Sequence, residues 1–114
     1  MRVLVACEYS GRVRDAFADK GHNAWSCDLL LSEKPGQHYQ GDVRDMLTAH
    51  DWDLMIAHPP CTYLTCAAEW CYNDIQTKKL DPDKLYGAKR REAREKALEF
   101  VMLLANAPVP RIAI

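Results

Sequence analysis

Short apolar runs and longer amphipathic stretches alternate along this chain. Residues 2–7 form an apolar, β-branched run, and residues 11–20 follow with apolar side chains at Val13 and Phe17 before Gly21 ends the pattern. Apolar residues spaced three to four apart indicate a helix with one buried face. The first 21 residues therefore predict a strand, a turn and a helix.

The middle of the chain repeats this alternation. Residues 23–28 predict a second strand that ends on an acid, and residues 53–57 predict a strand that is apolar on both faces, as in a parallel sheet. The intervening residues 32–41 are rich in turn formers. Asp42 stands where a third strand should end, and it would cap a short helix over residues 43–50.

The last part of the chain predicts one long helix and one more strand. Residues 83–105 carry apolar positions at steps of three and four, which indicates a helix. Pro108 and Pro110 end this helix, and residues 111–114 begin a further strand. Strands that alternate with helices predict an α/β fold, a Rossmann-like parallel sheet with flanking helices. We expect a single domain over residues 1–114.

Composition and charge narrow the class of protein. Hydrophobic residues make up 48% of the chain and charged residues 27%, which is typical of a globular protein and not of a disordered one. No apolar run approaches the ~20 residues of a membrane-spanning helix, and the first residues lack the pattern of a signal peptide. We therefore expect a cytoplasmic protein with no membrane partner. The net charge of −1 predicts only modest affinity for DNA by this chain alone.

The five cysteines are more typical of free thiols than of a disulfide framework, because their number is odd and the other features indicate the cytoplasm. Cys61, Cys66 and Cys71 are spaced every five residues. This spacing matches neither the paired cysteines of zinc ribbons nor a helical pair of histidines. We expect no metal site.

The turn after the first predicted strand is the first candidate for ligand binding. It contains Glu8, Tyr9, Ser10 and Gly11, and it leads from the carboxyl end of a strand into a helix. Ligands of open α/β sheets bind at such ends, and a helix amino terminus favours an anionic group. A single glycine before a helix is also consistent with a simple tight turn.

Two acids strengthen this prediction. Asp28 ends the second strand about twenty residues after the turn, where an acid in nucleotide-binding sheets accepts hydrogen bonds from ribose. Asp42 stands at the expected end of the third strand. Either acid alone fits equally well as a helix cap or as an exposed loop charge, but the set indicates a nucleoside site.

The segment after the apolar strand 53–57 is the candidate for covalent chemistry. Pro59 and Pro60 stiffen the backbone there, so the next side chain, that of Cys61, is presented at the sheet edge with little freedom. A thiolate in this position is suited to attack an electrophilic ring carbon. The alternative is a buried structural cysteine in a proline-rich turn.

Taken together, these motifs resemble those of the cytosine-5 DNA methyltransferases, in particular the short bacteriophage and prophage proteins related to them. Residues 3–11 look like the first motif of that family, Asp28 like its ribose-binding acid, and residues 41–43 like its adenine-contacting turn. The sequence Pro59-Pro60-Cys61 looks like the proline-cysteine motif. The resemblance covers nearly the whole chain.

This resemblance implies a cofactor, a reaction and a set of site residues. S-adenosylmethionine would be the cofactor, and Cys61 would add to carbon 6 of a flipped cytosine and so activate carbon 5 for methylation. The substrate would be DNA in a bacterial host cell. The residues expected to bind the cofactor are Glu8, Tyr9, Ser10, Gly11, Asp28, Asp42 and Pro59.

The resemblance also implies that the methyltransferase fold is truncated. In that family the strand matching residues 111–114 leads into a Glu-Asn-Pro or Glu-Asn-Val motif, and this sequence stops at Ile114. We expect a domain that is incomplete at its carboxyl end. An edge strand there would leave backbone groups and an apolar face unpaired, which favours a homodimer or a complementary chain as partner.

Three other interpretations stay open. One is a non-catalytic nucleoside-binding or interaction module of phage origin that keeps the sheet without the catalytic end. Another is an amino-methyltransferase, whose Asp/Asn-Pro-Pro-aromatic loop would have His58 and Cys61 in place of its two diagnostic residues. The third is a cysteine hydrolase, for which no histidine or acid has a suitable spacing.

Two local patterns have both a functional and a structural interpretation. Trp70 and Tyr72 are suited to stack on a base, but packing within the protein explains them better. A run of basic residues could follow a DNA backbone, but glutamates interleave with it at a spacing of four, which favours a solvated helix face. The basic residues are Lys78, Lys79, Lys84, Lys89, Arg90, Arg91, Arg94 and Lys96.

Overall fold

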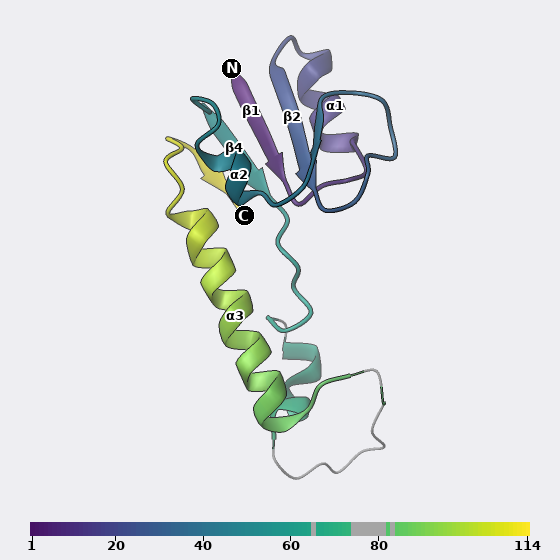
Figure 1. Cartoon of the computed structure of the whole chain (residues 1–114), viewed down its shortest axis with the longest axis vertical. Coiled ribbons are helices and arrows are strands. Elements are labelled where there is room, and N and C mark those ends of the chain that lie inside the picture. Colours follow the sequence, from purple (N-terminus) through teal and green to yellow (C-terminus); the bar gives the residue numbers. More distant parts are fainter. Residues whose placement is uncertain (65, 74–81, 83) are drawn as a thin grey trace. The chain divides into compact units, whose positions relative to one another are not determined.

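The computed structural model describes residues 1–64, 66–73, 82 and 84–114. The chain divides into two compact units (Figure 1). Met1–Pro59 and Leu104–Ile114 form the first, here called the sheet unit, and Pro60–Leu103 form the second, here called the cysteine unit. None of the described helices is long and apolar enough to span a membrane.

The sheet unit is built on five parallel strands in the order β3-β2-β1-β4-β5. The strands are β1 (Arg2–Ala6), β2 (Asn23–Asp28), β3 (His38–Gln40), β4 (Leu54–Ala57) and β5 (Ile112–Ala113). This order is that of the first five strands of a Rossmann-type sheet. The predicted α/β fold with a parallel sheet and flanking helices is therefore confirmed, and it is compatible with a Rossmann-like fold.

Both faces of the central strand β1 are buried. Val3 and Val5 point to one face and Leu4 and Ala6 to the other, and all four side chains are fully buried. On the Val3 side, Val13 and Phe17 of α1 (Arg12–Asp19) pack against Val3, Val5 and the buried Ala24 of β2. An apolar strand buried on both faces explains why residues 2–7 show a continuous apolar run rather than an alternating one.

The first helix matches its prediction closely. α1 begins after Gly11, which adopts a left-handed conformation with φ 76°, and it ends at Asp19. Gly21 also has a positive φ of 88°, and the Lys20 and Gly21 amides donate to carbonyls of the last turn. A left-handed glycine just past the last turn is a common helix stop, as the sequence indicated.

The segment between β2 and β4 differs from the prediction in two ways. Residues 38–40 form β3, inside the stretch 32–41 that is rich in turn formers, so the third strand expected to end at Asp42 ends at Gln40 instead. The helix expected over residues 43–50 is only one turn long, α2 (Arg44–Leu47). A helix continued to His50 would need the Met46 carbonyl for the His50 amide, but that oxygen accepts from the indole of Trp52 at 2.6 Å and from the Ala49 amide.

The cysteine unit contains a 3₁₀ helix, η1 (Cys66–Tyr72), and most of α3 (Gly87–Ala105). Sequence reasoning did not foresee η1. It also placed the start of α3 too early, at Asp83, which lies outside the described residues. Gly87 has a φ of 58°, and a left-handed residue cannot continue a right-handed helix, so α3 begins there.

Candidate functional site

The carboxyl edge of the sheet contains a topological switch point. The chain leaves β1 for β2 on one side, whereas β4 lies on the other side of β1. The segments that follow β1 and β4 therefore diverge, and ligands of open α/β sheets bind in the crevice between such segments. The His58 amide still donates to the Ala6 carbonyl at 3.0 Å, so the two segments separate just beyond this bond.

The structure brings the predicted cofactor residues of the sheet unit to this one edge. The strands are parallel, so the ends of β1, β2, β3 and β4 all point the same way. Tyr9 is exposed, Gly11 and Glu8 are buried, and the rest are half-buried. The half-buried members are Ser10, Asp28, Asp42 and Pro59.

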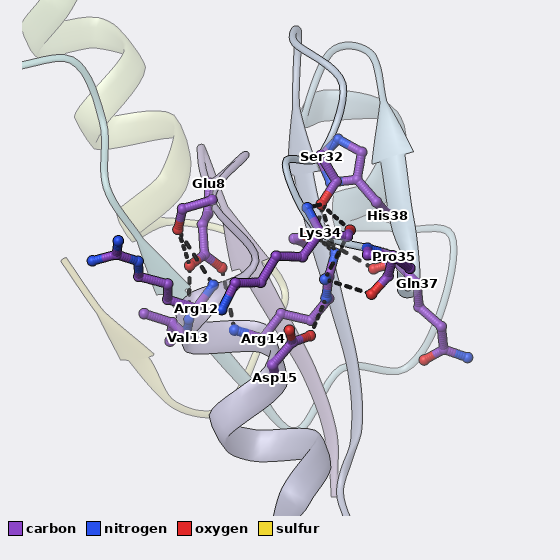
Figure 2. Close-up of polar contacts among 12 residues, drawn as sticks. Glu8, Arg12, Val13, Arg14, Asp15, Ser32, Lys34, Pro35, Gln37 and His38 are labelled. Atoms are coloured by element: carbon purple, nitrogen blue, oxygen red, sulfur yellow. Dashed lines mark hydrogen bonds and ion pairs between the residues drawn. The ribbon is translucent and has the colours of Figure 1, made fainter.

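Glu8 is the buried carboxylate of the turn, and it faces the amino terminus of α1 (Figure 2). Its Oε1 accepts from the Ser10 hydroxyl at 3.0 Å and from the Val13 amide at 2.8 Å, and its Oε2 accepts from the Arg14 amide at 3.2 Å. Ser10 Oγ in turn accepts from the Arg12 amide. The anion expected at this helix terminus is therefore the chain's own Glu8 carboxylate.

Arg14 is the most important residue that sequence reasoning missed. Its side chain is 1% exposed and reaches from α1 across to residues 32–35 (Figure 2). The guanidinium donates to Asp15 Oδ1, to the hydroxyls of Ser26 and Ser32, and to two carbonyls, all at 2.9–3.3 Å. A basic residue inside an amphipathic helix usually points to solvent, so no local signal in the sequence indicates this burial.

Gly11 and Gly36 leave room for this guanidinium. A Cβ on Gly11 would lie 2.6 Å from Arg14 Nη2, and a Cβ on Gly36 would lie 2.7 Å from Arg14 Cζ. Any larger residue would displace the arginine or the loop. The glycine of the first motif is therefore needed for its left-handed conformation and for this close approach.

A relay of hydrogen bonds extends from Arg14 to the loop after β2. Ser26 Oγ accepts from Arg14 and contacts His38 Nδ1 at 2.7 Å, while His38 Nε2 lies 2.9 Å from the Leu30 carbonyl. A carbonyl oxygen only accepts, so His38 Nε2 carries a proton and donates it to the Leu30 carbonyl. The relay fixes the position of the Leu30 peptide.

Asp28 holds the preceding peptide group of this loop, because its Oδ1 accepts from the Leu30 amide at 2.9 Å. The loop therefore has a fixed backbone, yet Leu29, Leu30 and Leu31 are 72%, 56% and 71% exposed. The Glu33 amide donates to the Tyr9 carbonyl at 2.8 Å, which ties this loop to the turn after β1. A firmly held apolar surface thus stands beside the candidate ribose acid.

Cys7 is the residue between β1 and the Glu8 turn, and it has a positive φ of 61°. Burial, together with the negative charges of Asp28 and Asp42, raises its pKa to about 11. Burial, followed by the nearby Cys7 thiol and the acids Asp28, Asp42 and Asp45, raises the pKa of the neighbouring Cys27 to about 12. Both thiols therefore stay protonated at neutral pH, and neither is suited to be a nucleophile.

Asp42 does not act as the residue that begins α2, because that position is held by Val43. Its Oδ1 nevertheless accepts from the Arg44 amide at 2.9 Å, and its Oδ2 lies 3.0 Å from the Arg44 guanidinium. The Arg44 amide, and then the Arg44 side chain, lower the pKa of Asp42. The acid is therefore ionised at neutral pH, and it lies two residues after the end of β3.

The cysteine unit contains Cys61, and its side chain is exposed, unlike those of Cys7, Cys27 and Cys71. This exposure does not fit the alternative of a buried structural cysteine. Tyr72 is buried, and its hydroxyl donates to the Tyr63 carbonyl at 2.6 Å, so the packing interpretation of Tyr72 is confirmed.

The expectation of a solvated basic face is wrong for Arg90. This residue of α3 is 4% exposed, and its guanidinium lies 5.1 Å from the ring centres of both Tyr63 and Tyr72. The apolar stem and planar head of arginine suit such a stacked position. Of the other basic residues expected on that face, Lys78 and Lys79 lie outside the described residues.

Neither metal-site geometry nor homology assigns a function to this site. In the described ranges, no three histidine, cysteine or acidic side chains are grouped so as to hold a metal ion. Comparisons of the chain with protein-family models, curated proteins and solved structures give no match. The chemistry of the named residues therefore carries the functional argument.

Proposed function

We propose that this chain is the cofactor-binding and cysteine-bearing part of an S-adenosylmethionine-dependent DNA cytosine-5 methyltransferase. The observation that carries the proposal is the burial of the Glu8 carboxylate at the amino terminus of α1, on the sheet edge where β2 ends on Asp28. This arrangement favours a nucleoside that brings no phosphate to the turn.

The argument rests on charge. Dinucleotide cofactors place their pyrophosphate on the first helix amino terminus of such a sheet, where free amides accept it. Here the Arg12 amide donates to Ser10, and the Val13 and Arg14 amides donate to Glu8. A phosphate at this turn would find these three amides already engaged and would meet a carboxylate. A nucleoside with a positive charge meets no such repulsion.

Asp28 and the loop that follows it fit the ribose and base of that nucleoside. Asp28 uses Oδ1 for the Leu30 amide, whereas Oδ2 has no hydrogen-bond partner within the described part of the chain. A free carboxylate oxygen at this place suits the ribose hydroxyls. The exposed leucines 29–31 offer an apolar surface to a flat base.

The proposed reaction needs a methyl donor and a nucleophile on the chain. Bound S-adenosylmethionine supplies a methyl group on a sulfonium centre, whose positive charge agrees with the acidic edge formed by Glu8, Asp28 and Asp42. Cys61 is the proposed nucleophile, which adds to carbon 6 of cytosine and so makes carbon 5 reactive. Its exposure supports this role, because a flipped base must reach the thiol.

The first test is calorimetric titration of the chain with S-adenosylmethionine, with its demethylated product and with NAD and ATP. We expect saturable binding of the first two, an affinity loss of about 10- to 100-fold in Asp28→Ala, and no binding of the phosphate-bearing nucleotides. Preferential binding of NAD or ATP would contradict the proposal. Asp19→Ala, at the far end of α1, is the matched control for the loss of one acid.

The second candidate function is a non-catalytic nucleoside-binding or interaction module. The three consecutive exposed leucines at positions 29–31 favour it, because such a surface suits a protein partner as well as a base. The two candidates differ at Cys61. Methyltransferase chemistry predicts that the chain forms a covalent adduct with a mechanism-based cytosine analogue in DNA and that Cys61→Ser abolishes the adduct, whereas the module predicts no adduct in either form.

A further inference from the structure

Arg90 is a buried cation that the proposed function has not used. Its Nη1 donates to the Leu85 carbonyl at 3.3 Å and its Nη2 to the Thr62 carbonyl at 3.4 Å, while its Nε is buried with no hydrogen-bond partner. The rings of Tyr63 and Tyr72 supply its other contacts. No carboxylate within the described ranges forms an ion pair with it.

This environment holds the guanidinium without neutralising it. Taking a charged side chain out of water is unfavourable, and two long hydrogen bonds with two ring contacts offset only part of that cost. The ion pair between Arg94 and Glu69 at 3.6 Å, which is in the same unit, does not include Arg90. Arg90 therefore projects an uncompensated positive charge into its surroundings.

The first of those surroundings is the segment that contains Cys61. Thr62, whose carbonyl accepts from Arg90, is the next residue after Cys61, and Tyr63, whose ring lies against the guanidinium, follows it. Both the backbone and a side chain of this segment are thus fixed to one residue of α3. The exposed Cys61 thiol therefore lies one residue before the Thr62 carbonyl that Arg90 holds.

We propose that Arg90 is the positioning residue of Cys61: it holds the Thr62 carbonyl, one residue after Cys61, and so brings a positive charge to the segment that presents the thiol. This inference rests on the proposed function, in which the thiol must attack as an anion. A nearby cation attracts and stabilises negative charge at the sulfur as the sulfur approaches the cytosine ring. Arg90 itself touches neither base nor cofactor in this role.

The experiment compares alkylation of Cys61 by iodoacetate, which is anionic, with alkylation by iodoacetamide, which is neutral. Both reagents consume the same thiolate and release iodide, so the ratio of their rate constants cancels the effects of thiol exposure and ionisation. Peptide mass spectrometry follows Cys61 apart from the other cysteines. We expect Arg90→Met to lower the iodoacetate-to-iodoacetamide ratio about threefold at low salt.

Two variants separate charge from packing. Arg90→Lys keeps the charge and is expected to hold the ratio near that of the unaltered chain. Lys89→Met removes an exposed charge from the neighbouring position of α3 and is expected to leave the ratio unchanged. An unchanged ratio in folded Arg90→Met, or an equal fall in Lys89→Met, would overturn the proposal.

If Arg90→Met does not fold, the salt dependence of the alkylation ratio in the unaltered chain tests the proposal. Salt screens both the local positive charge and the repulsion between thiolate and iodoacetate, so from about 20 mM to about 0.5 M salt the ratio should rise less for Cys61 than for a free cysteine thiol. A salt dependence equal to that of the free thiol would overturn the proposal. The test is separate from the cofactor titration: failure of S-adenosylmethionine to bind removes the proposed function and leaves this ratio unaffected.

Discussion

The sheet unit and the cysteine unit each bury one arginine, and the two side chains are treated differently. Arg14 of the sheet unit donates to one carboxylate, two hydroxyls and two carbonyls. Arg90 of the cysteine unit donates to two carbonyls, keeps an unpartnered Nε, and rests against two tyrosine rings. The two side chains are 1% and 4% exposed, so the difference lies in their partners and not in burial.

This difference indicates two roles for the same residue type. A buried charge whose donors are all satisfied serves the fold, because it joins the elements that supply the acceptors. A buried charge with a donor left over is a poor way to stabilise a fold, and such groups are enriched where charge serves function. We therefore assign Arg14 to the architecture of the cofactor edge and Arg90 to the chemistry of Cys61.

The largest effect that this comparison predicts is the loss of stability when the Arg14 side chain is replaced. Arg14→Met should lower the free energy of unfolding by about 3–5 kcal/mol, because Ser26, Asp15 and the loop carbonyls lose a buried charged partner together. Urea unfolding followed by circular dichroism measures the change. Arg12→Met, at an exposed site two residues away, is the matched control, and equal losses in both variants would contradict the assigned role of Arg14.

The second effect is a loss of stability at alkaline pH. The pKa values of Cys7 and Cys27 in the folded chain, about 11 and about 12, lie above the ordinary thiol value of 9.0. Above pH 9 the unfolded chain loses these protons first, so stability falls as pH rises toward 11, and these groups have no effect below pH 9. The slope is at most about 1.4 kcal/mol per pH unit for buried Cys27 and smaller for half-buried Cys7.

Urea unfolding at pH 8, 9 and 10 measures this slope. Cys7→Ser removes one of the two titrating thiols, so its decline between pH 9 and 10 should be shallower than that of the unaltered chain. Cys61→Ser is the matched control, because the proposed role of Cys61 lies in chemistry and not in folding. The same decline in Cys7→Ser and in the unaltered chain would show that other groups cause it.

The third effect concerns the carboxylate that fills the α1 terminus. Glu8→Gln should destabilise the chain by about 1–2 kcal/mol, because an amide group replaces an anion at the positive end of a helix and points a donor toward an amide donor. Thermal unfolding measures this loss. Glu33→Gln removes an exposed acid and is expected to change stability by less than about 0.5 kcal/mol. If the two losses are equal, Glu8 does not act as the anion of the terminus.

The sequence predicted the elements that depend on local pattern. Apolar runs predict the strands, and the spacing of apolar residues before Gly21 predicts α1. The ends of the apolar runs predict which residues lie at the carboxyl edge of the sheet. β3 is only three residues long and carries His38, Tyr39 and Gln40, so it has no apolar signal, and its pairing is decided by contact with β2. Short strands of this kind depend on tertiary contacts that the local pattern does not encode.

The site could be predicted only at the level of residue type. The positions of Glu8, Asp28 and Asp42 at one edge follow from strand ends, but the direction of the Glu8 side chain does not, because a carboxylate in a turn can face solvent, ligand or helix. The burial of Arg14 and Arg90 was also beyond the pattern. Each side chain crosses from a helix to a distant segment, and neither Ser26 nor Thr62 lies near its arginine in sequence.

The smallest predicted effect is the change in the free energy of unfolding when Arg90 is replaced, and it compares directly with the change at Arg14. Arg90→Met should change the free energy of unfolding by less than about 1 kcal/mol, because the lost contacts are offset when a buried, incompletely satisfied charge is replaced by an apolar side chain of similar length. Urea unfolding of Arg90→Met beside Arg14→Met measures both. A loss at position 90 as large as that at position 14 would make Arg90 a structural arginine like its counterpart. A small loss together with a lower iodoacetate-to-iodoacetamide ratio would separate the chemistry of Cys61 from the stability of the unit that contains it.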